Sequence, residues 1–196
     1  MKNSIKIFSV IAVLLIQVPY IFAQENVDNN RLKLEFEPGL FFNNGRSLNI
    51  LYNVTKDNNL GIGLYLMTTD IPDQIARNMF VDYNDSLNCR VTQEFALNVR
   101  YRFRVAKNME SNPYVGLILG WENILIEKEG FNDLNYKTFL FTPFVGYEWY
   151  VYKRMLYINP QIRSAFYLGA TKSVDTRPEE LKSFLMVPSI SVGLRI

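Results

Sequence analysis

The feature that most constrains the fold is an alternation of apolar and polar residues that recurs from residue 32 to the end. Between residues 92 and 105, the apolar set is Phe95, Leu97, Val99, Tyr101, Phe103 and Val105. The intervening set is Glu94, Ala96, Asn98, Arg100, Arg102 and Arg104. A helix with 3.6 residues per turn would mix these sets, whereas a strand places them on opposite faces. The pattern therefore predicts a strand with one apolar and one polar face.

The same alternation predicts a chain of eight strands. The segments are 32–37, 47–54, 60–67, 92–105, 114–122, 138–149, 156–168 and 184–196. An even number of antiparallel strands is typical of a closed, up-and-down transmembrane β-barrel. The connections alternate in length, and the short ones are Asn43-Asn44-Gly45, 56–59, 106–112 and Tyr152-Lys153. The longer loops, 68–90, 128–135 and 169–182, are then expected outside the cell together with the short connection Asn43-Asn44-Gly45. The turns 56–59, 106–112 and Tyr152-Lys153 are expected in the periplasm.

The first residues predict an export signal. Lys2 and Lys6 precede the apolar run 7–18, and Ala23 ends the segment. About a dozen apolar residues are too few for a transmembrane helix, which needs ~20, so we expect a cleaved signal peptide at 1–23 and a barrel domain at 24–196. Cleavage removes two lysines and no acid, which leaves 19 basic and 19 acidic residues. This balance gives no general attraction to nucleic acid.

The alternation of apolar and polar residues does not by itself say which face of the barrel meets water. A soluble lipocalin-like barrel turns its apolar face inward, whereas a membrane barrel turns it toward lipid. The polar face favours the membrane form, because it carries charges in mid-strand and glycines that leave room for long side chains. We predict a charge network in the lumen, made by Lys33, Glu35, Glu37, Glu94, Arg100, Arg102, Arg104, Glu122, Glu148, Arg163 and Arg195.

Aromatic residues on the apolar face are expected at two levels, as in the interfacial girdles of membrane barrels. The outer level comprises Phe42, Phe95, Trp121, Phe139, Phe166 and Phe184. The periplasmic level comprises Tyr52, Tyr101, Phe103, Tyr147 and Trp149. Further rings are expected to point inward and fill the lumen, namely Tyr65, Tyr114, Phe144, Tyr150, Tyr157 and Tyr167. Eight strands enclose an interior just wide enough for side chains to fill it.

Segments 113–117 and 143–147 share a Pro-aromatic-Val-Gly pattern, and the chain ends with Val192-Gly193-Leu194-Arg195-Ile196. With the signal peptide and the eight segments, these pieces make the sequence resemble the small outer-membrane β-barrels of Gram-negative bacteria. The match is to the porin-family or OmpA/OmpX-like group, especially the Bacteroidetes type. The resemblance implies location in the outer membrane, contact with its lipids, and recognition of the last strand by the assembly machinery. Family members usually end in an aromatic residue, and Ile196 departs from this pattern.

The inventory of reactive residues argues against an enzyme. The chain has no His and one Cys, whereas small barrels with lipid-modifying activity resemble one another in using a His with a Ser or an acid. We expect no catalytic residue, no metal site and no cofactor. Inward charges must pair to be tolerated, so their structural role outweighs acid–base chemistry. Cys89 is expected to be a packed small residue.

The expected function is that of a monomeric, non-enzymatic outer-membrane barrel with an envelope-structural or surface-interaction role. Its longer loops would contact an extracellular protein or host ligand. Two alternatives stay open: a narrow channel or small-ligand transporter, and a soluble periplasmic ligand-binding barrel. In the loop 68–90, the helical spacing of Ile71, Ile75 and Met79 fits either a contact site or a loop packed over the barrel mouth. Pro143 and Pro160 fall within predicted strands and are interpreted as bulges.

Overall fold

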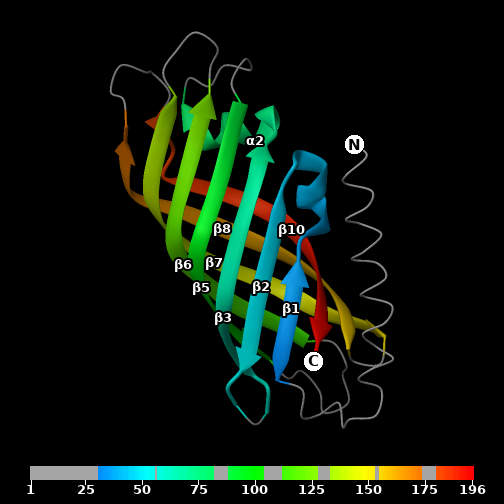
Figure 1. Cartoon of the computed structure of the whole chain (residues 1–196). Coiled ribbons are helices and arrows are strands. Elements are labelled where there is room, and N and C mark those ends of the chain that lie inside the picture. Colours follow the sequence, from blue (N-terminus) through cyan, green and yellow to red (C-terminus); the bar gives the residue numbers. More distant parts are fainter. Residues whose placement is uncertain are drawn as a thin grey trace.

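The computed structural model describes residues 31–55, 57–81, 88–103, 112–127, 133–152, 155–173 and 180–196. Among these residues, eight antiparallel strands close into a barrel in the order β1-β10-β8-β7-β6-β5-β3-β2 (Figure 1). They are β1 (Leu32–Phe36), β2 (Arg46–Asn53), β3 (Leu60–Ile71), β5 (Asn88–Arg102), β6 (Asn112–Glu127), β7 (Leu134–Tyr152), β8 (Leu156–Lys172) and β10 (Phe184–Arg195). The predicted fold is confirmed. The predicted signal peptide and Arg104 lie outside the described residues.

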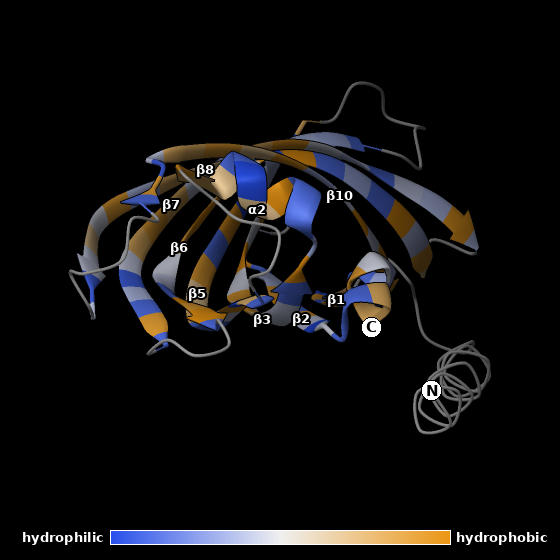
Figure 2. Cartoon of the chain, turned by 90° about the horizontal axis from the view of Figure 1, so that it is seen from above, coloured by the Kyte–Doolittle hydropathy of each residue, from blue (hydrophilic) through white to orange (hydrophobic). Residues whose placement is uncertain are grey.

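The apolar face of the barrel points outward and the polar face inward. Val145, Ile162 and Ile190 are each more than half exposed, whereas Glu35, Arg100 and Glu148 are almost completely buried. Figure 2 shows the alternating bands along the strands from above. Soluble monomers rarely expose continuous apolar surface on this scale. The arrangement is the reverse of what the soluble lipocalin-like alternative requires. Among the described residues, no helix has the length and apolarity needed to cross a membrane.

The aromatic side chains predicted for the girdles lie on the outer wall in rows set by strand register. Phe95 pairs with Trp121, which pairs with Phe139, and the last two rings are 5.2 Å apart between centroids. A second row joins Phe166 to Phe184, with centroids 5.0 Å apart. Toward the opposite end lie Tyr52, Tyr101, Phe103, Tyr147 and Trp149, all at least 40% exposed.

Phe42 is also exposed but does not lie on a strand. It belongs to the 3-10 helix η2 (Pro38–Asn43), so the first connection is longer than the predicted hairpin at Asn43-Asn44-Gly45. Pro38 stands at the start of this helix, where the missing N–H costs nothing. Asn44 then takes a left-handed conformation with φ of 50°, and the Gly45 N–H donates to the Leu40 carbonyl at 2.8 Å.

A bulge in β5 reverses the predicted orientation of Glu94. The register to β6 shifts by one residue between Thr92 and Phe95. Gln93 consequently points inward with 2% exposure, and both Glu94 and Phe95 face outward. Period two predicts orientation only while each residue opposes one partner, and a bulge breaks that rule. The placement of Glu94 in the lumen is therefore wrong.

The predicted bulges at Pro143 and Pro160 are also wrong. Pro143 pairs with Leu117 of β6, and Pro160 pairs with Ile190 of β10, without a register shift at either place. The shifts involving β7 and β8 occur instead at Lys137/Phe139 and Tyr150/Tyr152. Each proline lacks only the N–H donor, so a ladder can pass it by losing one bond while keeping its register.

Helix α2 (Asp73–Met79) and a two-stranded sheet cover the barrel end that is predicted to face outward, which is called the outer end below. Helix α2 follows β3 and is succeeded by β4 (Phe80–Val81), which pairs with β9 (Glu180–Leu181). Ala76, Met79 and Phe80 are buried in a cluster with Leu140 and Tyr167 from the barrel wall. The described part of the loop 68–90 therefore packs over the mouth. Cys89 lies in the same apolar cluster with 4% exposure, as expected of a packed residue.

The hydrogen-bonded wall of the barrel is short at β1. β1 pairs with only the last part of β10, from Val192 to Arg195, and η2 stands beyond the end of β1. The described contacts of η2 run to β10, β3 and β2. A helical turn, and not a hydrogen-bonded strand, thus closes the barrel beside the outer part of β10.

Candidate functional site

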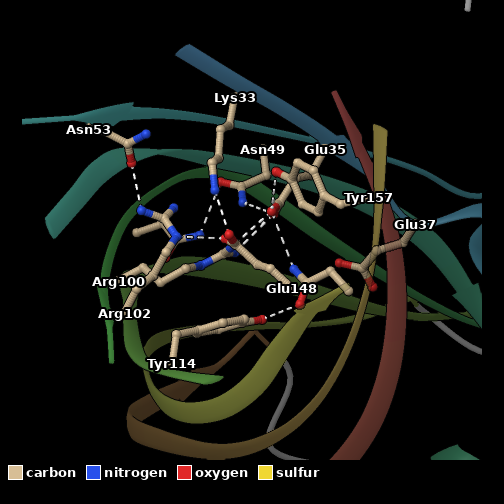
Figure 3. Close-up of polar contacts among 12 residues, drawn as sticks. Lys33, Glu35, Glu37, Asn49, Asn53, Arg100, Arg102, Tyr114, Glu148 and Tyr157 are labelled. Carbon is tan, nitrogen blue, oxygen red and sulfur yellow. Dashed lines mark hydrogen bonds and ion pairs between the residues drawn. The ribbon is translucent and has the colours of Figure 1, made fainter. Parts of the chain in front are cut away.

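The inner wall brings charged side chains together near the barrel end where Leu32 and Ile196 pair backbone to backbone. They come from strands that are not neighbours in the sheet: β1 is separated from β5 by two strands and from β7 by two others. Their contacts must therefore cross the lumen. Figure 3 shows the side chains converging from opposite walls. We call the set Lys33, Glu35, Arg100, Arg102 and Glu148 the lumen network.

Arg100 binds Glu35 in a two-pronged ion pair. Arg100 Nη1 donates to Glu35 Oε1 at 2.6 Å, and Nη2 donates to Oε2 at 2.9 Å. The carboxylate also accepts hydrogen bonds from Asn49, Tyr157 and Asn159, at 2.6, 2.8 and 3.3 Å. Planar guanidinium and carboxylate groups match in this geometry, which fixes both side chains. Five hydrogen bonds hold a carboxylate that has almost no contact with solvent.

Glu148 joins the other cations. Lys33 Nζ lies 2.5 Å from Glu148 Oε2, and Arg102 Nε lies 2.8 Å from Oε1. Arg100 Nη1 reaches the same Oε1 at 3.2 Å. Glu148 itself has no solvent exposure. Because Arg100 contacts both carboxylates, the two ion-pair systems form one continuous structure across the lumen.

Aromatic rings fill the space around these charges. Arg100 Cζ lies 4.4 Å from the centre of the Tyr114 ring, and Lys33 Nζ lies 5.0 Å from that of Tyr157. Both distances are within the range of cation–π attraction. The Tyr114 hydroxyl donates to Asn159 Oδ1 at 2.5 Å. Rings and ions therefore pack as one plug.

Three glycines make room for these rings. Tyr114 pairs with Gly146, Phe144 with Gly116, and Tyr157 with Gly193 across adjacent strands. A Cβ atom at any of the three glycines would collide with the partner ring. This explains the repeated Pro-aromatic-Val-Gly pattern: β6 and β7 run antiparallel, so the ring of each copy covers the glycine of the other.

A smaller cluster lies nearer the outer end. Arg163 Nη2 is 2.5 Å from Glu37 Oε1, and Arg163 Nη1 is 3.0 Å from the Tyr65 hydroxyl. The Tyr65 hydroxyl donates to the same Glu37 oxygen at 2.6 Å. Glu37 directly follows β1, while Tyr65 and Arg163 lie on β3 and β8, so this cluster also bridges the lumen.

Of the other predicted charges in the described residues, two are buried and one is exposed. Glu122 is buried, but its Oε1 has no hydrogen-bond partner among the described residues. Arg195 is buried and lies opposite Lys33 in the β1–β10 register. Glu94 faces outward, as described above.

The charge prediction did not include the neutral partners Asn49, Asn53, Asn98, Asn159 and Tyr157. All occupy inward positions of the same alternation, so strand parity was the signal that could have found them.

The network is arranged for stability more than for reaction. The carboxylates of Glu35 and Glu148 are held by cations, amides and hydroxyls, so neither of these two groups is free to act as a base. Among the described residues, no group of three or more His, Cys, Asp or Glu side chains is placed to bind a metal ion.

Known structures share this fold. Neisserial surface protein A superposes with a TM-score of 0.52 at 10% identity, over 84% of this chain and 93% of that one. A major outer membrane protein from Thermus thermophilus gives 0.53 at 11% identity, over 85% and 98%. No family model and no curated protein sequence matches the chain. At such low identity, the similarity shows a common outer-membrane-barrel fold and carries no residue roles.

Proposed function

We propose that the chain is a sealed, non-enzymatic outer-membrane barrel with an envelope-structural or surface-interaction role. The observation that carries this proposal is the lumen network, in which Arg100 contacts Glu35 and Glu148 from different walls. A lumen crossed by ion pairs and packed with rings has no continuous path for solutes. The fold similarity to two outer-membrane proteins supports the location.

The apolar outer wall supports contact with lipid, since it would be costly to leave in water. The assembly machinery is expected to recognise β10, and the protein is expected to act as a monomer. A surface role is supported by the outer end, where Asp73, Gln74, Arg77 and Asn78 of α2 are exposed while Ala76 and Met79 face the core. This cap, formed by α2 with β4 and β9, presents a polar face suited to an extracellular protein or host ligand.

The non-enzymatic part of the proposal rests on chemistry. The chain contains no His, and the buried carboxylates of the lumen network are occupied by ion pairs. A general base must reach a substrate proton within hydrogen-bond distance, which these groups cannot do without breaking the plug.

Conductance in a planar lipid bilayer tests the sealed lumen. The purified, refolded barrel is expected to give no steady current under an applied voltage. Arg100→Ala, which removes the side chain that links both carboxylates, is expected to produce current fluctuations. Arg90→Ala provides a matched control, because Arg90 forms an exposed pair with Asp70 on the outer rim. A steady open conductance of the unmodified barrel would overturn the proposal in favour of a narrow channel.

A further inference from the structure

A cavity of about 140 Å³ lies inside the barrel between α2 and the Glu37–Arg163–Tyr65 cluster. Its walls include Met67, Ile118 and Leu140, and its roof includes Ile75 and Met79. The cavity is separate from the lumen network, none of whose five residues lines it. A volume of this size accommodates roughly one benzene-sized body.

Besides Arg163 Nε, three buried polar atoms at this cavity have no hydrogen-bond partner in the described part of the chain. Glu122 Oε1, Gln93 Nε2 and Thr142 Oγ1 lack a hydrogen-bond partner among the described residues. All three side chains line the cavity and are at most 3% exposed. They come from adjacent strands β6, β5 and β7, and the β5 bulge is what turns Gln93 inward. Buried polar atoms are nearly always hydrogen-bonded in folded proteins, so three at one cavity mark a place for a polar ligand group.

We propose that this cavity binds a small, neutral, apolar molecule that carries one hydroxyl group. The apolar body fits among Met67, Ile118 and Leu140. A hydroxyl both donates and accepts, so it can donate to the Glu122 carboxyl and accept from the Gln93 amide. An ammonium group only donates and would leave the Gln93 N–H groups without an acceptor. The binding site is independent of the sealed lumen, because the network below it closes the barrel whether or not the cavity is filled.

The cavity extends to the side of the barrel where β1 is short and η2 lies beside β10. Leu40 and Asn43 of η2 line it together with Leu185 and Val187 of β10. At this seam η2 stands beside the part of β10 that lies beyond its β1 pairing. Separation of η2 from β10 would therefore admit a ligand without breaking strand hydrogen bonds between them.

Fluorine NMR with para-fluorophenol tests the proposal on the full barrel in detergent, with empty micelles as background. We expect a saturable shift that fluorobenzene, which lacks the hydroxyl, and para-fluorobenzylamine, which carries an ammonium, reproduce only at higher concentration. Gln93→Leu should weaken phenol binding roughly ten-fold, the effect of one lost hydrogen bond to a buried group. Ala165→Leu, which adds bulk to the cavity lining, should weaken all three probes.

Glu94→Gln is the matched control, because it changes the neighbouring residue on the outer face and should leave binding unchanged. If Gln93→Leu does not fold, the near-isosteric Gln93→Met removes the same amide hydrogen bond. The proposal is overturned by the absence of a saturable shift above the micelle background. It is also overturned if fluorobenzene binds as tightly as the phenol, or if the amine binds more tightly than the phenol. Unchanged phenol affinity in whichever Gln93 variant folds would overturn it as well. None of these results depends on conductance, so the sealed-lumen proposal fails or stands separately.

Discussion

Arg100 of β5 and Glu35 of β1 meet face to face in the lumen, joined by hydrogen bonds of 2.6 and 2.9 Å although two strands separate them in the sheet. Both side chains are at most 2% exposed. Such a pair costs much desolvation energy, and it becomes tolerable only when its geometry and remaining hydrogen bonds are good. The amides and hydroxyls around Glu35 supply those bonds. The pair therefore crosses the lumen and joins opposite walls of the barrel.

Replacing Arg100 by Met is predicted to destabilise the barrel by about 3–5 kcal/mol, because Glu35 would remain buried without its cation. The measurement is equilibrium unfolding in detergent by tryptophan fluorescence. Adding Glu35→Gln to Arg100→Met should recover part of the loss, since no unpaired charge then remains at that position. Arg90→Met should change stability by about 1 kcal/mol or less, because Arg90 is 53% exposed in its pair with Asp70. Equal effects of Arg100→Met and Arg90→Met would count against a buried, paired Arg100.

Gly146→Ala is predicted to cost roughly 1–3 kcal/mol, the usual range for overpacking. The new methyl group would collide with the Tyr114 ring, which also covers Arg100. Thermal unfolding checks this expectation. Gly39→Ala is the control, because a Cβ atom there meets nothing within 4 Å. Unchanged stability of Gly146→Ala would mean that Tyr114 does not lie against the glycine.

The topology predicts which end of the barrel faces outward. Asn78 is exposed on α2, and Asp57 is exposed in the turn between β2 and β3 at the opposite end. In intact cells, Asn78→Cys should react with a thiol reagent that cannot cross membranes, whereas Asp57→Cys should react only after permeabilisation. Cys89 is buried and should add little background. Labelling of Asp57→Cys in intact cells, with Asn78→Cys protected, would reverse the proposed orientation.

Alternation along the chain was enough to predict the number of strands and their antiparallel closure. The charges and glycines on the polar face were needed to predict that the apolar face points outward. A strand repeats every two residues, and that regularity is visible in any single segment. Alternation gave the wrong orientation for Glu94 because of the bulge in β5. A bulge is a property of two paired strands, and the sequence of one strand does not show where its register to the other shifts. Alternation could not show that Arg100 meets Glu35, because contacts across a lumen depend on how the sheet closes.

The cap was predictable only in outline. The spacing of Ile71, Ile75 and Met79 indicated a helical turn. Helix α2 is present and contains Ile75 and the buried Met79, whereas Ile71 is the last residue of β3. The pairing of Phe80–Val81 with Glu180–Leu181 joins segments about a hundred residues apart, and two-residue strands carry no periodic signal. The cavity likewise depends on the shapes of side chains from several strands, which no single segment of the sequence reveals.

The most direct test of the central claim, that the apolar wall faces lipid while the charges face inward, uses the two tryptophans of the chain. Trp121 and Trp149 are 66% and 57% exposed and lie toward opposite ends of the outer wall. In lipid vesicles, Trp149→Phe and Trp121→Phe each leave a single reporter whose fluorescence can be quenched by lipids brominated at different depths. Both reporters are predicted to be quenched most strongly by bromines near the headgroups, where interfacial aromatics lie. Lack of quenching at both positions by lipid-borne bromine, with quenching by an aqueous quencher, would contradict the claim.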